Sequence, residues 1–199
     1  MAEPQAGFTR GKGLLEPYLA RRRAAMANRL IPIERRNGRI LDIGCGAYPY
    51  FLAHTAFKEK YAIDQLPPSG DTKKIRWHTL DLNTDPVLPF SEAYFDMVTM
   101  LAVAEHLNPH SLELLLKEVH RILKPGGLVL ITTPSARADG LLHWMARLGL
   151  VSSEEIEEHT FAYTLPLLGW GFGKAGFEMR AVRFGYFEMG LNLWATAER

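Results

Sequence analysis

The fold is predicted from one stretch of the chain, Arg39-Ile-Leu-Asp-Ile-Gly-Cys-Gly-Ala-Tyr-Pro-Tyr-Phe51. Its first apolar residues predict the end of a buried strand, Gly44 and Gly46 predict a turn, and Pro49 predicts the first turn of a helix. Backbone without a Cβ lets a ligand come close, and the free N–H groups at the start of a helix favour a negative group. The stretch therefore predicts a site for a nucleotide-like ligand.

The spacing of the glycines indicates which kind of nucleotide is expected. A dinucleotide site requires Gly-x-Gly-x-x-Gly, and the last position counted from Gly44 is Pro49, which cannot take that glycine's part in packing the helix on the strand. Asp42 lies two residues before Gly44. A carboxylate there repels a pyrophosphate but attracts an ammonium or sulfonium group, directly or through water. We therefore expect a ligand that carries positive charge near this loop.

The run Leu41-Asp-Ile-Gly-Cys-Gly46 resembles motif I of the class I S-adenosylmethionine-dependent methyltransferases, although Tyr48 stands where many members carry a third glycine. The run His120-Arg-Ile-Leu-Lys-Pro-Gly-Gly127 resembles the family's signature before its fifth strand. The resemblance covers about residues 39–199 and points to the small-molecule, type 11 methyltransferase-domain branch. It implies an α/β fold with a Rossmann-like, doubly wound sheet of seven strands. That sheet is mostly parallel, with one antiparallel strand near the C-terminus and helices on both faces.

Length and composition suit a single domain of 199 residues. We expect an N-terminal amphipathic helix and lead-in over residues 1–38, then a methyltransferase domain over 39–199 with a lid insertion at about 134–164. A net charge of +1 argues against a protein-wide attraction to nucleic acid. The single cysteine rules out an internal disulfide, and no apolar segment has the roughly 18 residues of a membrane span. We expect a cytoplasmic protein.

The resemblance implies S-adenosyl-L-methionine as the cofactor and S-adenosyl-L-homocysteine as the product. Asp64 ends a short apolar strand about 20 residues after the glycine loop, which is the distance at which a second strand delivers a carboxylate to a ribose. In the resembled family, residues at the positions of Asp81 and Leu82 contact the adenine, and residues at the end of the fourth strand contact the cofactor through backbone and side chain. The predicted cofactor-binding residues are Asp42, Gly44, Cys45, Gly46, Asp64, Gln65, Asp81, Leu82, Met100 and Leu101.

Methyl transfer from a sulfonium group mainly requires alignment, and a base is needed only when the acceptor is a hydroxyl or phenol. His106, after the fourth strand, is the leading candidate base, and the alternative is that the pair Glu105-His106 braces the loop. His159 and Tyr163, on the expected lid, are candidates for contact with the acceptor, with a surface role as the alternative. Relatives often have an acid at the position of Ala102, and we predict no metal site.

The predicted acceptor is a small, moderately apolar molecule or lipid intermediate, methylated on O, N or C, because the lid and tail are rich in aromatic residues. DNA is disfavoured as an acceptor, since Leu101-Ala-Val-Ala104 replaces the Asp/Asn-Pro-Pro-aromatic segment of enzymes that methylate exocyclic amines. The only cysteine, Cys45, lies in the cofactor loop and not where cytosine methylation needs one. Two alternatives stay open, namely an NAD-dependent oxidoreductase and a non-catalytic methyltransferase-like binding module. The sequence does not indicate an oligomeric state.

Overall fold

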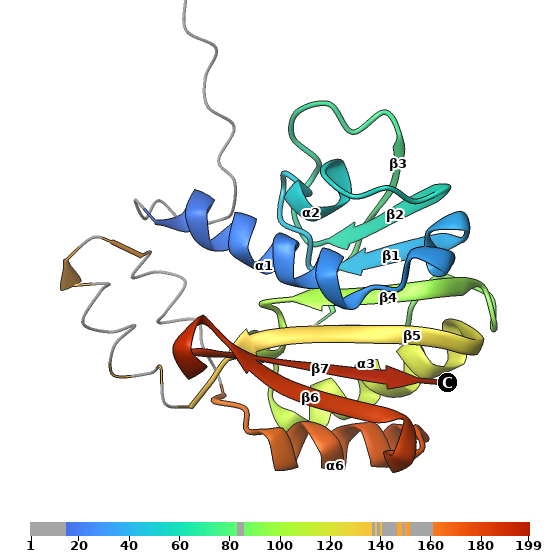
Figure 1. The fold of residues 1–199 in the computed structure, drawn as a ribbon. Helices are drawn as coiled ribbons and strands as arrows, with labels where there is room; N and C mark the ends of the chain where they lie inside the picture. Colours follow the sequence, from blue (N-terminus) through green and yellow to red (C-terminus); the bar gives the residue numbers. More distant parts are fainter. Residues whose placement is uncertain are drawn as a thin grey trace, which may run out of the picture.

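The computed structural model describes residues 15–82, 86–136, 138, 140, 147–148, 150–151 and 161–199. These residues form one seven-stranded sheet in the order β3-β2-β1-β4-β5-β7-β6 (Figure 1). The strands are β1 (Arg39–Ile43), β2 (Glu59–Asp64), β3 (Ile75–Thr79), β4 (Phe95–Leu101), β5 (Leu123–Pro134), β6 (Val182–Phe187) and β7 (Asn192–Glu198).

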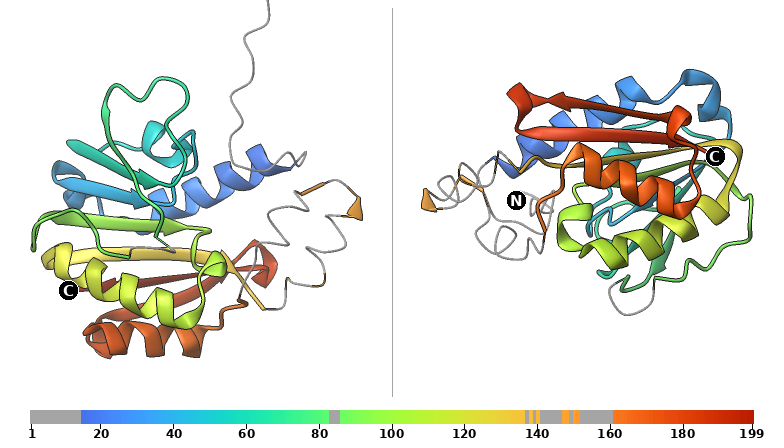
Figure 2. Two further views of the ribbon diagram at one scale, coloured as in Figure 1. Left: turned by 180° about the vertical axis from the view of Figure 1, so that it is seen from behind. Right: turned by 90° about the horizontal axis from the view of Figure 1, so that it is seen from below.

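Helices cover both faces of the sheet (Figure 2). α1 and α2 contribute to the apolar cluster on one face, and α3 and α6 pack together on the other. The helices are α1 (Glu16–Leu30), α2 (Tyr50–Ala53), α3 (Pro109–Ile122) and α6 (Leu165–Ala175), with short 3-10 turns η1 (Ile33–Asn37), η2 (Ala104–His106), η3 (Met179–Ala181) and η4 (Glu188–Gly190). None of these helices is long and apolar enough to cross a bilayer.

Strands β1 to β5 run parallel, β7 is antiparallel to β5, and β6 is antiparallel to β7. The predicted fold class, with one antiparallel strand near the C-terminus, is therefore confirmed. Parallel strands end at one edge, and ligands of open α/β sheets bind at that carboxyl edge. The β6–β7 turn lies there too, because Asn192 pairs with Pro134 and the Ser135 N–H donates to the Leu191 carbonyl at 2.8 Å.

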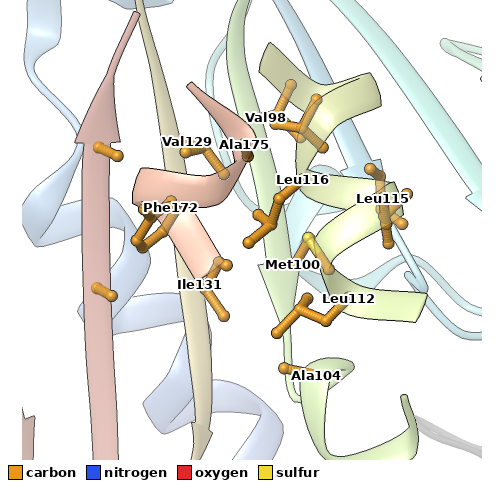
Figure 3. Close-up of a cluster of buried hydrophobic side chains, with 14 of the residues drawn as sticks. Val98, Met100, Ala104, Leu112, Leu115, Leu116, Val129, Ile131, Phe172 and Ala175 are labelled. Carbon is orange, nitrogen blue, oxygen red and sulfur yellow. The ribbon is translucent and has the colours of Figure 1, made fainter. Parts of the chain in front are cut away.

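Apolar residues at helical spacing after Asn108-Pro109 predict a helix with one buried face, and the core between the sheet and α3 follows this pattern (Figure 3). Asn108 caps the helix, since its Oδ1 accepts from the Ser111 N–H at 3.0 Å, and Pro109 occupies the first turn. The buried face of α3 consists of Leu112, Leu115, Leu116, Val119 and Ile122. This packing holds in place the segment between β4 and α3, which lies at the carboxyl edge of the sheet.

Two elements differ from the sequence-based expectation. The helix predicted after the glycine loop is a single turn, Tyr50–Ala53, for which Pro49 is the N-cap. A four-residue helix has little dipole, so the expected attraction of its start for a negative group does not hold. The sequence from Gly185 to Gly190 predicts a turn that joins the last two strands as an antiparallel pair. The observed turn is shorter, because β6 runs on to Phe187. Gly185 serves packing instead, since a Cβ there would lie 2.5 Å from the Trp194 ring.

Candidate active site

The glycine loop begins where β1 ends, and both of its glycines have left-handed backbone, with φ of +68° at Gly44 and +71° at Gly46. A Cβ on Gly44 would lie 2.5 Å from Cγ2 of Val103, so Gly44 is needed for packing against the segment after β4. A Cβ on Gly46 would meet nothing closer than 4.0 Å. Gly46 therefore leaves space beside the loop into which a ligand can approach the backbone.

Asp64 ends β2 and joins it to the glycine loop. Its Oδ2 accepts from the Gly46 N–H at 2.8 Å and its Oδ1 accepts from the Leu66 N–H at 2.9 Å. The side chain is only 3% exposed. A carboxylate oxygen accepts more than one hydrogen bond, so these contacts do not exclude the hydroxyls of a ribose.

Asp42 lies opposite Thr99 in the β1–β4 pairing, and the Thr99 hydroxyl donates to its Oδ1 at 2.6 Å. Burial raises the pKa of Asp42 to about 7, the negative charge of Asp64 adds to the rise, and the Thr99 hydrogen bond opposes it. A substantial fraction of Asp42 is therefore protonated at neutral pH. Direct contact with a ligand is not favoured by this burial, so we expect its charge to act at a distance or through water. Thr99 was not among the predicted site residues, although it is a polar residue inside an apolar strand.

Cys45 is half-buried in the same loop, and its Sγ contacts the Gly46 carbonyl at 3.5 Å. Burial raises the pKa of the Cys45 thiol, and the neighbouring Asp42 and Asp64 raise it further. The group therefore stays a neutral thiol and lines the loop without acting as a nucleophile.

The remaining predicted cofactor residues follow β2 and β3. Gln65 is exposed directly after the β2 carboxylate, while Asp81 and Leu82 are half-buried after the end of β3. Leu82 also packs against the core. Because β1, β2 and β3 are parallel neighbours, the three predicted carboxylates lie at or near the ends of successive strands, at one edge of the sheet. Their roles as ligands remain predictions.

The structure corrects the role predicted for Met100. Its side chain is fully buried in the core beneath α3, near Leu112 and Ala104 (Figure 3). Only the Met100 backbone remains available to a cofactor. The next side chain, Leu101, points to the other face and is half-buried against the second apolar cluster. Alternation along the strand explains why two consecutive side chains cannot both face the ligand.

The segment after β4 turns sharply toward β5. Ala102 has a left-handed φ of +58°, and its N–H donates to the Thr132 carbonyl at 2.9 Å. Such a conformation costs a non-glycine residue about 1–2 kcal/mol and is often kept at functional sites. The turn directs Glu105, which is buried, and His106, which is half-buried, to the carboxyl edge. His106 stays a candidate base.

The prediction for Tyr163 is wrong on both alternatives. Its side chain is 1% exposed, and its hydroxyl donates to the Leu107 carbonyl at 2.8 Å. Burial raises the pKa of Tyr163, and the nearby Glu105 raises it further. The residue therefore anchors the segment before α6 to the segment before α3, and is neither a surface residue nor a proton carrier. His159 lies outside the described residues.

Two further features bear on the site. Among the described residues, no three His, Cys, Asp or Glu side chains are placed to hold a metal ion. An apolar groove of about 560 Å³ lies between α6 and β6, and its lining includes Trp170, Met179 and Phe184. None of the predicted cofactor residues lines this groove. The chemistry is therefore expected at the carboxyl edge and not in the groove.

Comparison with known proteins agrees with this geometry. The family described as "Methyltransferase domain" matches residues 15–182. The fold resembles a chain of the complex that contains the Haloferax volcanii Trm112 methyltransferase activator, with a TM-score of 0.69 and 16% identity over 92% of this chain and 91% of that one. It also resembles S-adenosylmethionine-dependent methyltransferases of Archaeoglobus fulgidus (TM-score 0.65, 18% identity, 88% and 92% covered) and Mesorhizobium loti (0.61, 18%, 94% and 99%). No curated protein sequence matches significantly.

The fold and the carboxyl-edge site define the class of S-adenosylmethionine-dependent methyltransferases with a Rossmann-like sheet. The chain belongs to the methyltransferase-domain family, and S-adenosyl-L-methionine is its methyl donor. The family description is general and does not separate the type 11 branch from others. The alternative of an NAD-dependent oxidoreductase is not supported. The residues fit the cofactor, because Gly46 leaves room beside the loop and an acid ends the second strand.

Proposed function

We propose that the enzyme methylates an O, N or C atom of a small, moderately apolar molecule. The observation that carries this proposal is the exposure of two large apolar side chains on segments at the carboxyl edge, Phe161 and Met189. Phe161 is partly exposed, and its N–H donates to the Glu105 carbonyl at 3.2 Å, next to the end of β4. Met189 is 99% exposed in the β6–β7 turn. Large apolar side chains left in water beside a site favour an acceptor with apolar surface.

The turn that carries Met189 is held in an unusual shape. Both Glu188 and Met189 have left-handed φ, of 53° and 55°. The Glu188 carboxylate binds Arg22 of α1 at 3.4 Å and Asn192 at 2.6 Å, and the Ser135 hydroxyl donates to the Gly190 carbonyl at 2.7 Å. These bonds hold an exposed methionine at the edge of the site, which supports a role in contacting the acceptor.

In the proposed reaction the cofactor supplies an electrophilic methyl group. The protein binds the ribose of the cofactor through Asp64 and the adenine through Asp81 and Leu82. The loop of Gly44 and Gly46 positions the rest of the cofactor. The segment after β4 aligns the acceptor, since in-line displacement gains mainly from orientation.

The test is a methyl-transfer assay with S-adenosylmethionine and a panel of small phenols, alcohols, amines and carboxylic acids. Product is detected by mass spectrometry, and polar sugars and a DNA duplex serve as comparison acceptors. We expect transfer to apolar members of the panel and a loss of that transfer in Met189→Ser, with S-adenosylhomocysteine affinity unchanged. Met179→Ser is the matched control, because Met179 is also exposed but lines the groove between α6 and β6. Transfer only to sugars or DNA would contradict the proposal.

A further inference from the structure

Two buried oxygens without an aligned hydrogen-bond partner lie beside each other in the described part of the chain, Oε2 of Glu105 and the Thr133 hydroxyl. The Thr132 hydroxyl also lacks a partner, but it points to the opposite face of the sheet, because consecutive side chains of β5 alternate. Glu105 and Thr133 are 3% and 1% exposed. Buried polar groups are nearly always hydrogen-bonded, because leaving them without partners costs free energy. A cluster of such groups therefore calls for an explanation.

The cluster lies at the carboxyl ends of β4 and β5. Thr132 pairs with Leu101, the last residue of β4, and Thr133 follows it. Glu105 is on η2, and Thr133 is close enough to favour its ionised form although no aligned hydrogen bond joins them. Val103, two residues before Glu105, is the residue that packs on the glycine loop. The short segment from Val103 to Glu105 thus links the cluster to the cofactor loop.

We propose that Glu105, with Thr133 beside it, is the subsite for the acceptor's reacting group, and that this group is an amine or a hydroxyl. The inference deepens the proposed function and rests on it. A carboxylate and a hydroxyl can accept from an N–H or O–H group, whereas a carboxylate acceptor would be repelled by Glu105. The subsite therefore selects amines and hydroxyl compounds against carboxylic acids.

The transfer step balances without any further reactant. A lone pair on the acceptor's nitrogen or oxygen forms the bond to the methyl carbon, the bond from that carbon to sulfur breaks, and its electron pair stays on sulfur. The proton lost by the acceptor passes to the Glu105 carboxylate, which later releases it to water. Glu105 is in this scheme a catalytic residue, and Thr133 is a positioning residue.

The surroundings of Glu105 suit a group that takes up a proton. Burial raises the pKa of Glu105, while His106 on the same turn and Arg23 from α1 act to lower it. Tyr163, from the segment before α6, is the other titratable group beside it. From β5 the neighbours are threonines, which do not titrate. A carboxyl group with a raised pKa is better matched to proton transfer near neutral pH than an ordinary one.

The experiment compares wild type with Glu105→Gln, with the apolar variant Glu105→Met and with Glu113→Gln as matched control, since Glu113 is paired with Lys117 on α3. We expect S-adenosylhomocysteine affinity to be unchanged in all of them. Transfer to amines and hydroxyl compounds should fall at least 100-fold in both Glu105 variants. The melting temperature of Glu105→Met should rise by about 2–4 °C, because an unpartnered buried carboxyl is removed.

Several results would overturn the proposal. One is a lower melting temperature for Glu105→Met, which would mean that an ordered water or a structural contact satisfies the carboxyl. Others are unchanged transfer in Glu105→Gln, and a wild type that methylates carboxylic acids but neither amines nor hydroxyl compounds. A wild type that fails to bind S-adenosylhomocysteine would instead contradict the proposed function itself, so the two failures are distinguishable.

Discussion

The carboxyl edge of the sheet has two halves that are built differently. In the cofactor half, at the ends of β1 and β2, each buried carboxylate has short hydrogen bonds. Asp64 accepts from two backbone N–H groups, and Asp42 accepts from Thr99. In the acceptor half, at the ends of β4 and β5, Oε2 of Glu105 and the hydroxyl of the neighbouring Thr133 lack such partners. The buried carboxylates of the cofactor half thus have their hydrogen-bond partners within the protein, whereas the buried groups named in the acceptor half do not.

This difference has a physical consequence. A satisfied polar network is rigid, so the cofactor half is organised before its ligand arrives. Unpartnered buried groups hold free energy that a ligand releases when it supplies the missing hydrogen bonds. Loss of a hydrogen-bonding side chain or of a loop glycine in the cofactor half should therefore weaken both binding and stability, whereas substitutions in the acceptor half should separate activity from stability.

The largest effect is expected for Asp64→Ala. The change removes the acceptor of the Gly46 and Leu66 N–H groups and the two predicted charge-assisted hydrogen bonds to ribose hydroxyls, each worth about 1.5–3 kcal/mol. Affinity for S-adenosylhomocysteine, measured by calorimetry, should fall by about 10²- to 10⁴-fold. Asp71→Ala is the control, because Asp71 is exposed and accepts from the nearby Lys73 N–H at 3.3 Å. If the two variants bind S-adenosylhomocysteine equally well, the assignment of Asp64 to the cofactor site is contradicted.

The next effect comes from the two glycines of the loop. Gly44→Ala should lower the free energy of unfolding by about 2–5 kcal/mol, through left-handed strain and the clash with Val103. Gly46→Ala carries similar strain but no clash, so we expect a loss of only about 1–2 kcal/mol together with weaker cofactor binding. Urea denaturation and calorimetry measure both quantities. Adding Val103→Ala to Gly44→Ala should recover part of the stability, and equal destabilisation by the two single variants would contradict this account.

The glycine turn, the strand that ends in Asp64 and the helical framework follow from local sequence patterns, because their signals lie close together in the chain. The cap at Asn108, the buried face of α3 and the left-handed Gly176 at the end of α6 are all set by residues within a few positions. The spacing between the glycine loop and Asp64 likewise reflects one helix-containing crossover. Such patterns can be recognised in the sequence without knowledge of the tertiary contacts.

Contacts between residues that are distant in sequence were predicted less well, in both halves of the site and elsewhere in the sheet. The partner of the Tyr163 hydroxyl is the Leu107 carbonyl, 56 residues away, which no local pattern reveals. The hydrogen bond between Thr99 and Asp42 spans 57 residues. A polar residue inside the apolar run of β4 was an available signal for Thr99. Gly185 was misassigned to a turn because the feature that requires a glycine there, the Trp194 ring, lies on the neighbouring strand.

A smaller effect, about 10- to 20-fold, is expected for the charge of Asp42. At an effective dielectric constant of about 20, a unit charge about 10 Å from the sulfonium contributes roughly 1.7 kcal/mol. Because the pKa of Asp42 is raised to about 7, the ratio of S-adenosylmethionine to S-adenosylhomocysteine affinity should increase from pH 5.5 to 8. In Asp42→Asn this ratio should not depend on pH. A ratio that stays constant in wild type would show that Asp42 does not act on the sulfonium.

The same group makes a separate prediction about stability. The folded protein holds the Asp42 proton more tightly than the unfolded chain, in which an aspartate has a pKa of about 3.9. The contribution of this group to stability is therefore present at low pH and is lost as the pH rises from about 4 to 7. The difference in melting temperature between Asp42→Asn and wild type should accordingly grow in favour of the variant over that range. A difference independent of pH would contradict the raised pKa.

The smallest effect is expected for Tyr163→Phe, which tests the acceptor half from its structural side. The change removes the donor to the Leu107 carbonyl, so the free energy of unfolding should fall by about 0.5–1.5 kcal/mol, while methyl transfer stays within about twofold of wild type. Tyr186→Phe is the control, because Tyr186 is half-exposed on β6 and should leave the melting temperature unchanged. A large fall in the transfer rate at an unchanged melting temperature would instead make the Tyr163 hydroxyl part of the chemistry. In that case the hydrogen bond to Leu107 would have to break during turnover. The assignment of a structural role to Tyr163 and a catalytic role to Glu105 would then no longer hold.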